Sequence, residues 1–153
     1  MEKIASFTVD HTKLLPGLYL SRRDGEITTF DLRFKRPNTG DLLTNSEMHS
    51  AEHLIATLLR NSPEKDAVIY FGPMGCQTGF YFLFDSRRLT DAEAISLLQR
   101  VFSAAAVYDD AMPGSSAVEC GNFANLSVKE GRRVCAFYAG VIANWTAEQL
   151  QYA

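Results

Sequence analysis

Runs of apolar side chains early in the chain predict a β-hairpin. Residues 18–22 and 26–35 flank Asp24-Gly25, and the second run is rich in β-branched and aromatic side chains. An Asp-Gly pair between two such runs is the strongest short-range signal for a hairpin. Two further strand-like runs, at residues 67–71 and 79–85, flank a glycine-rich turn. We therefore expect two hairpins, and a further short strand at residues 117–120.

Four segments begin with a Ser or Thr that is followed three positions later by Glu or Gln, a pattern typical of helix N-termini. The first three predict helices over residues 44–61, 90–109 and 127–144, and the fourth predicts a short turn from Thr146. The order hairpin, helix, hairpin, helices is typical of an α+β fold in which helices cover one face of an antiparallel β-sheet. The length of 153 residues suits one domain, so we expect residues 1–153 to form a single catalytic domain.

Composition narrows the class of protein. Hydrophobic residues make up 46% of the chain and charged residues 22%, which is typical of folded proteins and argues against intrinsic disorder. The formal charge of −3 argues against a nucleic-acid partner. No apolar run is long enough to span a bilayer and no signal peptide precedes the fold, so we expect no membrane association and a cytoplasmic location. Three cysteines, an odd and sparse set, favour a reducing compartment over a disulfide framework.

The first predicted helix contains the segment His49-Ser50-Ala51-Glu52-His53. Side chains four positions apart lie on one helix face, so both imidazoles can reach one metal ion. Glu52 borders the same face and can address a metal-bound water, as in the inverted zincin pattern H-x-x-E-H. Two surface histidines on an amphipathic helix are the alternative. Because the chain has only three histidines, the pairing of two in this motif favours a metal site.

A tight metal site needs a third protein ligand. The downstream candidates are Cys120, Glu119 and Glu130. Cys120 precedes a glycine in a predicted loop, where a thiolate can approach a metal closely, although free cysteines are also commonly buried as small apolar residues. Cys135 lies inside the third predicted helix, where a core position is the better interpretation.

Cys76 lies in a turn that contains three glycines and a proline within eight positions. Such a turn requires special backbone conformations and can present a thiol to a cleft. A thiolate close to a metal or a cation can then act as an acid or a base. The alternative is a tight hairpin in which the thiol only packs. No Gly-Lys-Ser/Thr follows, so the turn is not a phosphate-binding loop.

Several motifs are spread in order over nearly the whole chain. They are Ser6-Phe7 with Asp10-His11, Phe30-Asp31-Leu32-Arg33-Phe34 with Pro37-Asn38, His49-Ser50-Ala51-Glu52-His53-Leu54, Gly72-Pro73-Met74-Gly75-Cys76-Gln77-Thr78-Gly79-Phe80-Tyr81, and Cys120-Gly121-Asn122-Phe123. In this order the sequence resembles the LuxS family of S-ribosylhomocysteine lyases. The third and fourth motifs are the most specific.

The resemblance implies an α+β metalloenzyme fold and a homodimer with two active sites at its interface. It implies that a small-molecule substrate, S-ribosylhomocysteine, is cleaved to homocysteine and 4,5-dihydroxy-2,3-pentanedione, the precursor of a quorum-sensing autoinducer. It implies one divalent metal per subunit, iron(II), replaceable by zinc or cobalt. The residues matched as metal ligands are His49, His53 and Cys120; the matched acid/base pair is Glu52 and Cys76; the matched substrate-binding residues are Ser6, His11 and Arg33.

Two positions depart from the family pattern. Many members have an Asp where this chain has Tyr70, ahead of the turn that carries Cys76. Many members also have a His shortly after the Cys-Gly-Asn segment, where residues 123–126 read Phe-Ala-Asn-Leu. The second position is not a ligand in the matched set.

Two other functions compete with the lyase on the residues alone. In a small zinc peptidase of the inverted zincin type, Glu52 would activate water, and Glu119 or Glu130 would be the third ligand. The chain is short for such an enzyme, and Cys76 would have no role. A noncatalytic metal-binding domain would need a closed site with four ligands, and no fourth ligand has an obvious spacing.

Overall fold

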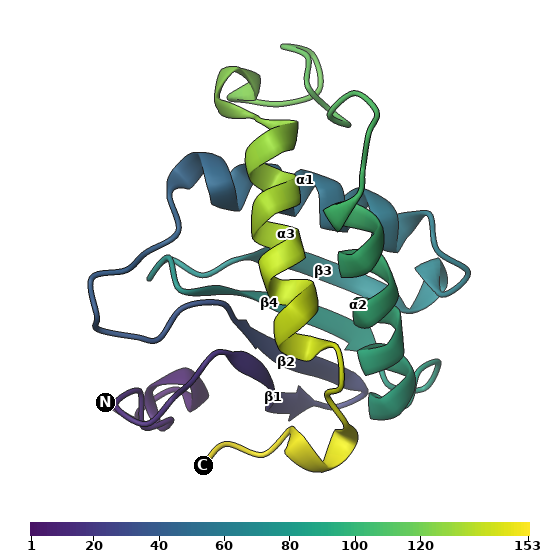
Figure 1. Ribbon diagram of the computed structural model, residues 1–153. Helices are drawn as coiled ribbons and strands as arrows, with labels where there is room; N and C mark the ends of the chain where they lie inside the picture. Colours follow the sequence, from purple (N-terminus) through teal and green to yellow (C-terminus); the bar gives the residue numbers. More distant parts are fainter.

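The computed structural model describes residues 1–153, and its elements follow the expected order (Figure 1). The strands are β1 Gly17–Asp24, β2 Ile27–Arg33, β3 Val68–Pro73 and β4 Gly79–Asp85; the helices are α1 Asn45–Arg60, α2 Asp91–Ala106 and α3 Val128–Ile142. Short 3-10 turns, which the sequence patterns did not all predict, are η1 Ala5–Phe7, η2 Lys65–Ala67, η3 Phe123–Asn125 and η4 Ala147–Gln149.

The four strands form one antiparallel sheet in the order β1-β2-β4-β3. In the first hairpin Asp24 pairs with Ile27, so the turn consists of Gly25 and Glu26, one residue later than the Asp-Gly pair suggests. Gly25 has a φ of +58°, a left-handed conformation that glycine adopts without steric cost. Both predicted hairpins are confirmed.

All three helices lie on the same face of the sheet (Figure 1). Phenylalanines at alternate positions of β2 and β4 point toward the helices. Phe30 of β2 and Phe82 of β4 are paired across the two strands, and both are fully buried. Tyr138 of α3 stacks on Phe34 with ring centroids 4.1 Å apart. Buried side chains from the sheet and from all three helices form one hydrophobic core. The prediction of an α+β fold with helices on one face of an antiparallel sheet is confirmed.

Local capping begins the helices where the sequence pattern placed them. Thr44 and Thr90 each accept a hydrogen bond from the backbone of the Glu three positions on, and each Glu side chain bonds back, which completes two capping boxes. None of the helices combines the length and the hydropathy needed to cross a lipid bilayer.

The predicted strand at residues 117–120 was wrong, because this segment forms a turn. The N–H groups of Glu119 and Cys120 both donate to the carbonyl of Ser116, at 3.1 and 3.0 Å. The Ser116 hydroxyl also donates to the Glu119 carboxylate at 2.6 Å. These local bonds satisfy backbone groups that a strand would need to pair across a sheet.

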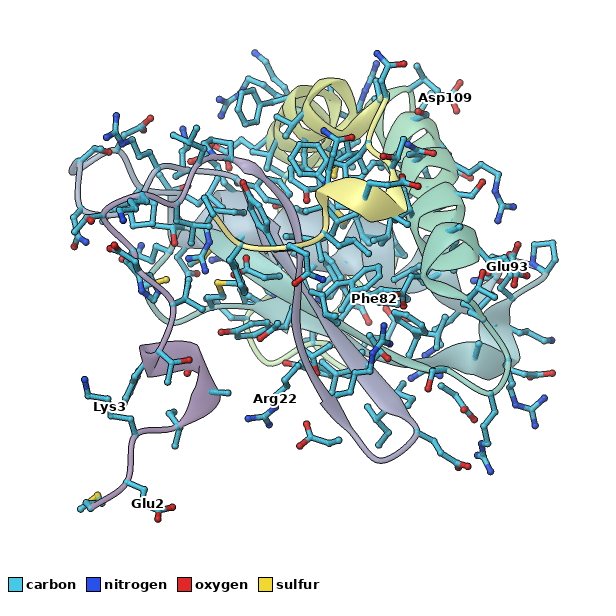
Figure 2. All side chains as sticks on the ribbon, turned by 90° about the horizontal axis from the view of Figure 1, so that it is seen from below. Glu2, Lys3, Arg22, Phe82, Glu93 and Asp109 are labelled. Carbon is cyan, nitrogen blue, oxygen red and sulfur yellow. The ribbon has the colours of Figure 1, made fainter.

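Polar side chains are buried on the sheet face that the helices leave uncovered. Thr29, Asp31 and Arg33 alternate with the core residues of β2 and are 7%, 2% and 2% exposed. Segments from both ends of the chain lie near β1 (Figure 1). In Figure 2, Phe82 lies within the interior and Arg22 points outward. The C-terminal segment bonds to β1 through the N–H of Leu20, which donates to Leu150 O at 2.8 Å.

Candidate metal centre and active site

Helix α1 presents two imidazoles side by side. The capping box at Thr44 starts the helix, and His49 and His53 then follow one turn apart. Their ring centroids are 4.6 Å apart and the ring planes are perpendicular. Both side chains are half-buried. The helical spacing read from the sequence therefore does place the two rings together.

Cys120 reaches these rings from the loop between α2 and α3. Its Sγ lies 3.3 Å from Nε2 of His49. The Cys120 sulfur and one ring nitrogen of each histidine all lie within 4.8 Å of one another. The backbone N–H of Asn122 points at the same sulfur from 3.4 Å, a contact that stabilises a thiolate. The loop thus completes a group of three potential metal ligands.

Hydrogen bonds orient both imidazoles. Nδ1 of His49 lies 2.5 Å from Oδ1 of Asn125, and Nδ1 of His53 lies 2.8 Å from the carbonyl oxygen of Pro113. Both partners are acceptors, so each Nδ1 carries the proton and each Nε2 keeps a free lone pair. Gly114, with a φ of +67°, permits the approach at His53, because a Cβ there would lie 3.2 Å from the ring.

The two carboxylates that competed with Cys120 for the third ligand position are engaged elsewhere. Glu119 accepts a hydrogen bond from the hydroxyl of Ser116, and Glu130 accepts one from the hydroxyl of Ser46. Glu130 belongs to the first turn of α3, where its backbone N–H also bonds the cap residue Ser127. The geometry therefore favours Cys120.

This donor set fits a divalent transition metal. Two neutral imidazoles and one thiolate are ligands that iron, cobalt and zinc all accept. Catalytic sites commonly use three protein ligands and leave a further position for water or substrate. The hydrogen-bonded Nδ1 atoms supply the outer support that metal-binding histidines usually have.

Glu52 lies between two depressions of the surface, each of which also contains one of the histidines. His49, Pro73 and Asn122 line one depression with Glu52, and His53, Pro113 and Gly114 line the other. The Glu52 carboxylate has no hydrogen-bond or ion-pair partner in the chain. It is therefore free to accept a proton from a bound molecule.

Hydrogen bonds of Gln77 to Met74 and Leu43 hold the turn that carries Cys76. Gln77 has a φ of +64°, and its N–H donates to Met74 O at 3.1 Å. The backbone N–H of Leu43 donates to the backbone carbonyl of Gln77, and the side-chain amide of Gln77 donates to the carbonyl of Leu43. The special conformation thus belongs to Gln77 and not to a glycine, while the Cys76 thiol itself is exposed.

Arg33 lies beneath this turn and is almost completely buried. Its Nε and Nη2 donate to the two oxygens of Asp31 at 3.1 and 2.7 Å. Its Nη1 donates to Thr78 Oγ1 at 2.7 Å and lies 3.9 Å from Cys76 Sγ. Burial by itself lowers the pKa of Arg33, but the charge and hydrogen bonds of Asp31 outweigh it, and the pKa is raised. Arg33 therefore provides a permanent positive charge next to the thiol.

Ser6 and His11 lie apart from both groups. Ser6 lines a depression on the uncovered face of the sheet, together with Thr29, Tyr70 and Tyr81. Nδ1 of His11 lies 2.9 Å from the carbonyl of Val9 in the N-terminal loop. Within one chain, the described contacts join neither residue to the His49–His53–Cys120 group.

Similarity to known sequences identifies the family of this chain. The family profile described as S-ribosylhomocysteinase (LuxS) matches residues 4–149. The chain belongs to the LuxS family. Proteins named S-ribosylhomocysteine lyase from Desulfotalea psychrophila, Finegoldia magna and Clostridium beijerinckii are 44%, 40% and 40% identical to it. Each of these alignments covers 99% of both chains.

The structure shows where the two departures from the LuxS pattern lie. Tyr70 is 52% exposed and lies over Gly72, where any Cβ would collide with its ring. It lines the depression that contains Ser6. In the segment at residues 123–126, Asn125 supplies the hydrogen-bond acceptor for His49.

Three residues that support the LuxS site were missed by sequence reasoning. They are Asn125, Asp31 and Thr78. For Asp31 a signal existed, because residues two apart on a strand share a face and Asp31 is therefore adjacent to Arg33. Asn125 had no such signal, since 76 positions separate it from His49.

Proposed function

We propose that this chain cleaves S-ribosylhomocysteine to homocysteine and 4,5-dihydroxy-2,3-pentanedione. It is an S-ribosylhomocysteine lyase, a carbon–sulfur lyase of the LuxS family, as its family match and its curated relatives indicate. The observation that carries the proposal at the level of residues is the group formed by His49, His53 and Cys120, with Glu52 on the same helix face.

His49, His53 and Cys120 hold the metal in this proposal, one ion per subunit. We assign iron(II) as the ion in the cell, with zinc or cobalt as substitutes, because imidazole and thiolate donors suit all three. When bound, such an ion supplies Lewis acidity that stabilises negative charge on a sugar oxygen. The chain's own contribution is to hold both Nε2 atoms and the sulfur in place.

Glu52 and Cys76 transfer protons in this proposal. The sugar carbonyl has to migrate along the carbon chain before the thioether can leave. In each migration the carbon beside the carbonyl loses a proton, the former carbonyl carbon gains one, and the hydroxyl proton moves to the former carbonyl oxygen. Glu52 has no competing partner, and the exposed Cys76 sulfur lies next to the Arg33 charge. In the final step a base removes a proton, the C–S bond breaks, and homocysteine leaves as a thiolate that is then protonated.

Ser6, His11 and Arg33 bind the substrate in this proposal. The Nε and Nη2 atoms of Arg33 are bound to Asp31, and one N–H of Nη1 bonds Thr78. The second N–H of Nη1, on the side of Cys76, is the group that addresses the substrate. A serine hydroxyl and an imidazole are suited to hydrogen-bonding the sugar hydroxyls or the amino-acid end.

The active unit in this proposal is a homodimer of single catalytic domains. Ile4, Tyr70 and Leu83 line a depression with Ser6 on the uncovered sheet face, and Phe7 close by in sequence is 67% exposed. Apolar side chains on an open sheet face are suited to burial against a second copy. In this proposal Ser6 and His11 of each subunit serve the metal group of the partner subunit, because within one chain they lie apart from it. Sedimentation at assay concentrations tests the dimer, and an active monomer would contradict it.

Thiol release tests the function directly. Metal-loaded protein is incubated anaerobically with S-ribosylhomocysteine, and free homocysteine is followed with a chromogenic thiol reagent. We expect release by the wild type and only background release by the Glu52→Gln variant with the same metal content. Cleavage of peptides without thiol release would instead favour the inverted zincin peptidase.

A further inference from the structure

Asp31 lies among three tyrosines on the uncovered face of the sheet. In the strand register it is directly opposite Tyr19 on β1 and Tyr81 on β4. A third tyrosine, Tyr152, comes from the segment after η4 and donates its hydroxyl to Oδ2 of Asp31 at 2.7 Å. Burial, together with the charge of Asp31, raises the pKa of Tyr152, so the hydroxyl keeps its proton at neutral pH.

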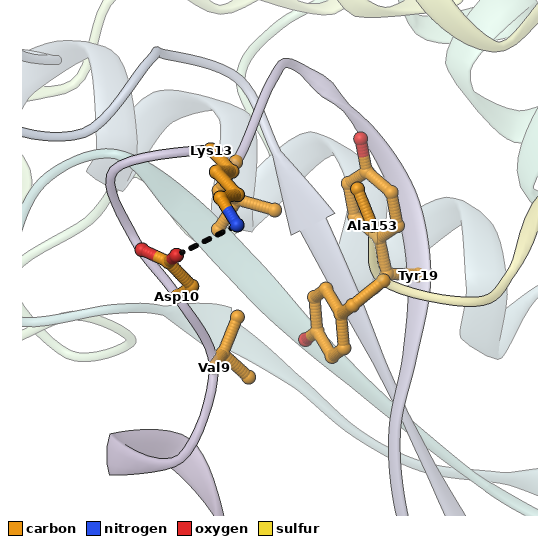
Figure 3. Close-up of a pocket in the computed structure, with 7 residues that line it drawn as sticks. Val9, Asp10, Lys13, Tyr19 and Ala153 are labelled. Atoms are coloured by element: carbon orange, nitrogen blue, oxygen red, sulfur yellow. Dashed lines mark ion pairs between the residues drawn. The ribbon is translucent and has the colours of Figure 1, made fainter.

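Tyr152 is held in place by contacts of its own. Its ring stacks on Tyr19 with centroids 5.1 Å apart and an interplanar angle of 20°. Both rings line a small pocket next to the N-terminal loop, where Lys13 pairs with Asp10 (Figure 3). The backbone bond from Leu20 to Leu150 anchors the segment two residues before Tyr152. The hydroxyl therefore meets Asp31 in a fixed orientation.

The hydrogen bonds continue from Asp31 to the thiol. Asp31 binds the fork formed by Nε and Nη2 of Arg33. On the opposite side of the guanidinium, Nη1 bonds Thr78 and lies 3.9 Å from Cys76 Sγ. Thr78 Oγ1 lies 3.0 Å from the same sulfur. Asp31 and Arg33 are 2% and 3% exposed at their side chains, so water screens this path poorly.

We propose that Tyr152 is a positioning residue that sets the reactivity of Cys76 through Asp31 and Arg33. Its hydroxyl offsets part of the Asp31 charge and holds the carboxylate in one orientation, so that Arg33 keeps Nη1 on the Cys76 side. Without the hydroxyl, the stronger negative charge of Asp31 draws the guanidinium away from the sulfur. The Cys76 sulfur then loses a nearby positive charge and becomes less reactive. As a contribution to turnover, the inference rests on the proposed proton-transfer role of Cys76.

Tyr152→Phe removes the hydroxyl and keeps the ring stacked on Tyr19. The matched control is Tyr19→Phe, which removes a hydroxyl from the same stack but one that bonds only the carbonyl of Leu15, at 2.9 Å. The first measurement is the rate of Cys76 alkylation by iodoacetamide at neutral pH, resolved from Cys120 and Cys135 by peptide mass. We expect about a 3–10-fold slower alkylation in Tyr152→Phe and wild-type alkylation in Tyr19→Phe.

The second measurement is steady-state turnover. In Tyr152→Phe we expect kcat/KM to fall by at least about the same 3–10-fold factor, because Arg33 both flanks the thiol and is a proposed substrate contact. Unchanged alkylation in Tyr152→Phe would overturn the inference, and so would an equal loss in Tyr19→Phe, which would assign the effect to the stack. If Cys76→Ala keeps full turnover, the proposed function of the thiol fails, while the alkylation rates still decide whether Tyr152 acts on it.

Discussion

The Nε2 atom of His49 lies 3.3 Å from Sγ of Cys120, although 71 positions separate the two residues. The first residue comes from a capped helix and the second from a turn closed by the Ser116 carbonyl. The two atoms are close enough to bind one ion. A cysteine sulfur binds a metal as a thiolate, so metal binding at this site is coupled to loss of the thiol proton. Removal of either partner has a direct consequence for the bound metal.

We expect Cys120→Ala to lose most of its metal, because two imidazoles alone make a weak site. Metal content per subunit after anaerobic purification is the measurement. Cys135→Ala is the matched control: Cys135 is fully buried within α3, and burial raises the pKa of its thiol to about 12. This control should keep metal and activity, with a modest loss of stability from the smaller side chain. Full metal content in Cys120→Ala would show that another residue is the third ligand.

We expect Asn125→Ala to weaken metal binding by about 10–100-fold, the usual effect of removing a residue that orients a ligating histidine. The variant leaves His49 without the acceptor that holds its Nδ1 proton. The affinity for Co²⁺ is measured by titrating the metal-free protein and following the absorption band of the cobalt–thiolate bond. Asn122→Ala changes a side chain in the same loop and should bind as the wild type does, while Asn125→Asp keeps an acceptor and should restore affinity. If Asn125→Ala bound Co²⁺ as tightly as the wild type, the bond between His53 and Pro113 would be sufficient to orient the metal site.

Glu52→Gln should keep its metal and bind substrate but turn over about 10²–10⁴-fold more slowly, the range for losing a positioned general base. The amide has nearly the same shape but cannot accept a proton. Single-turnover kinetics, with metal content checked in the same sample, is the test. A Glu52→Gln protein that is purified without metal would make Glu52 a ligand instead.

Cys76→Ala should likewise keep its metal, because Cys76 lies outside the group of three ligands. We expect turnover to fall by about 10²–10⁴-fold and a partly isomerised ketose to accumulate when its proton transfers become slow. Analysis of quenched reactions for the ketose is the measurement. Combined with Glu52→Gln, the loss should be less than additive, since both residues serve the same steps. Wild-type turnover would mean that the thiol only packs in its turn.

Glu47→Gln should destabilise the protein at neutral pH and not in acid. Burial raises the pKa of Glu47, but the hydrogen bonds from Thr44 and the charge of Arg133 outweigh it and lower the pKa below 4.5. A lowered pKa stabilises the fold above the unfolded-state value, and that contribution is lost as the pH falls through the folded-state value. We expect the Tm of Glu47→Gln to lie about 1–4 °C below the wild type at neutral pH.

The difference in Tm between Glu47→Gln and the wild type should shrink as the pH falls through the lowered folded-state pKa of Glu47 and its carboxylate becomes protonated. Glu93→Gln is the matched control, since Glu93 completes the same capping box on α2 without an ion pair. A constant difference between pH 7 and about pH 3 would show that shape, and not charge, accounts for the effect of Glu47→Gln.

The sequence by itself determined the local elements. Capping residues and apolar spacing act within a few positions, so the three helices and both hairpins were predicted to within a few residues. The same short range placed His49, Glu52 and His53 on one face of α1. The predicted strand at residues 117–120 failed because its backbone groups bond to Ser116, one turn away, instead of to a sheet.

Only the tertiary structure decided which residues meet across the chain. On spacing alone Cys120, Glu119 and Glu130 were all candidate ligands, and only the resemblance to LuxS singled out Cys120. The closure of the loop between α2 and α3 brings that thiol to His49. Tyr152 and Asp31 are 121 positions apart, so no spacing rule connects them. Such contacts depend on how the sheet, the helices and the segments at both ends pack together. Local hydrogen bonds do not fix the position of a loop, and the burial of the whole core does.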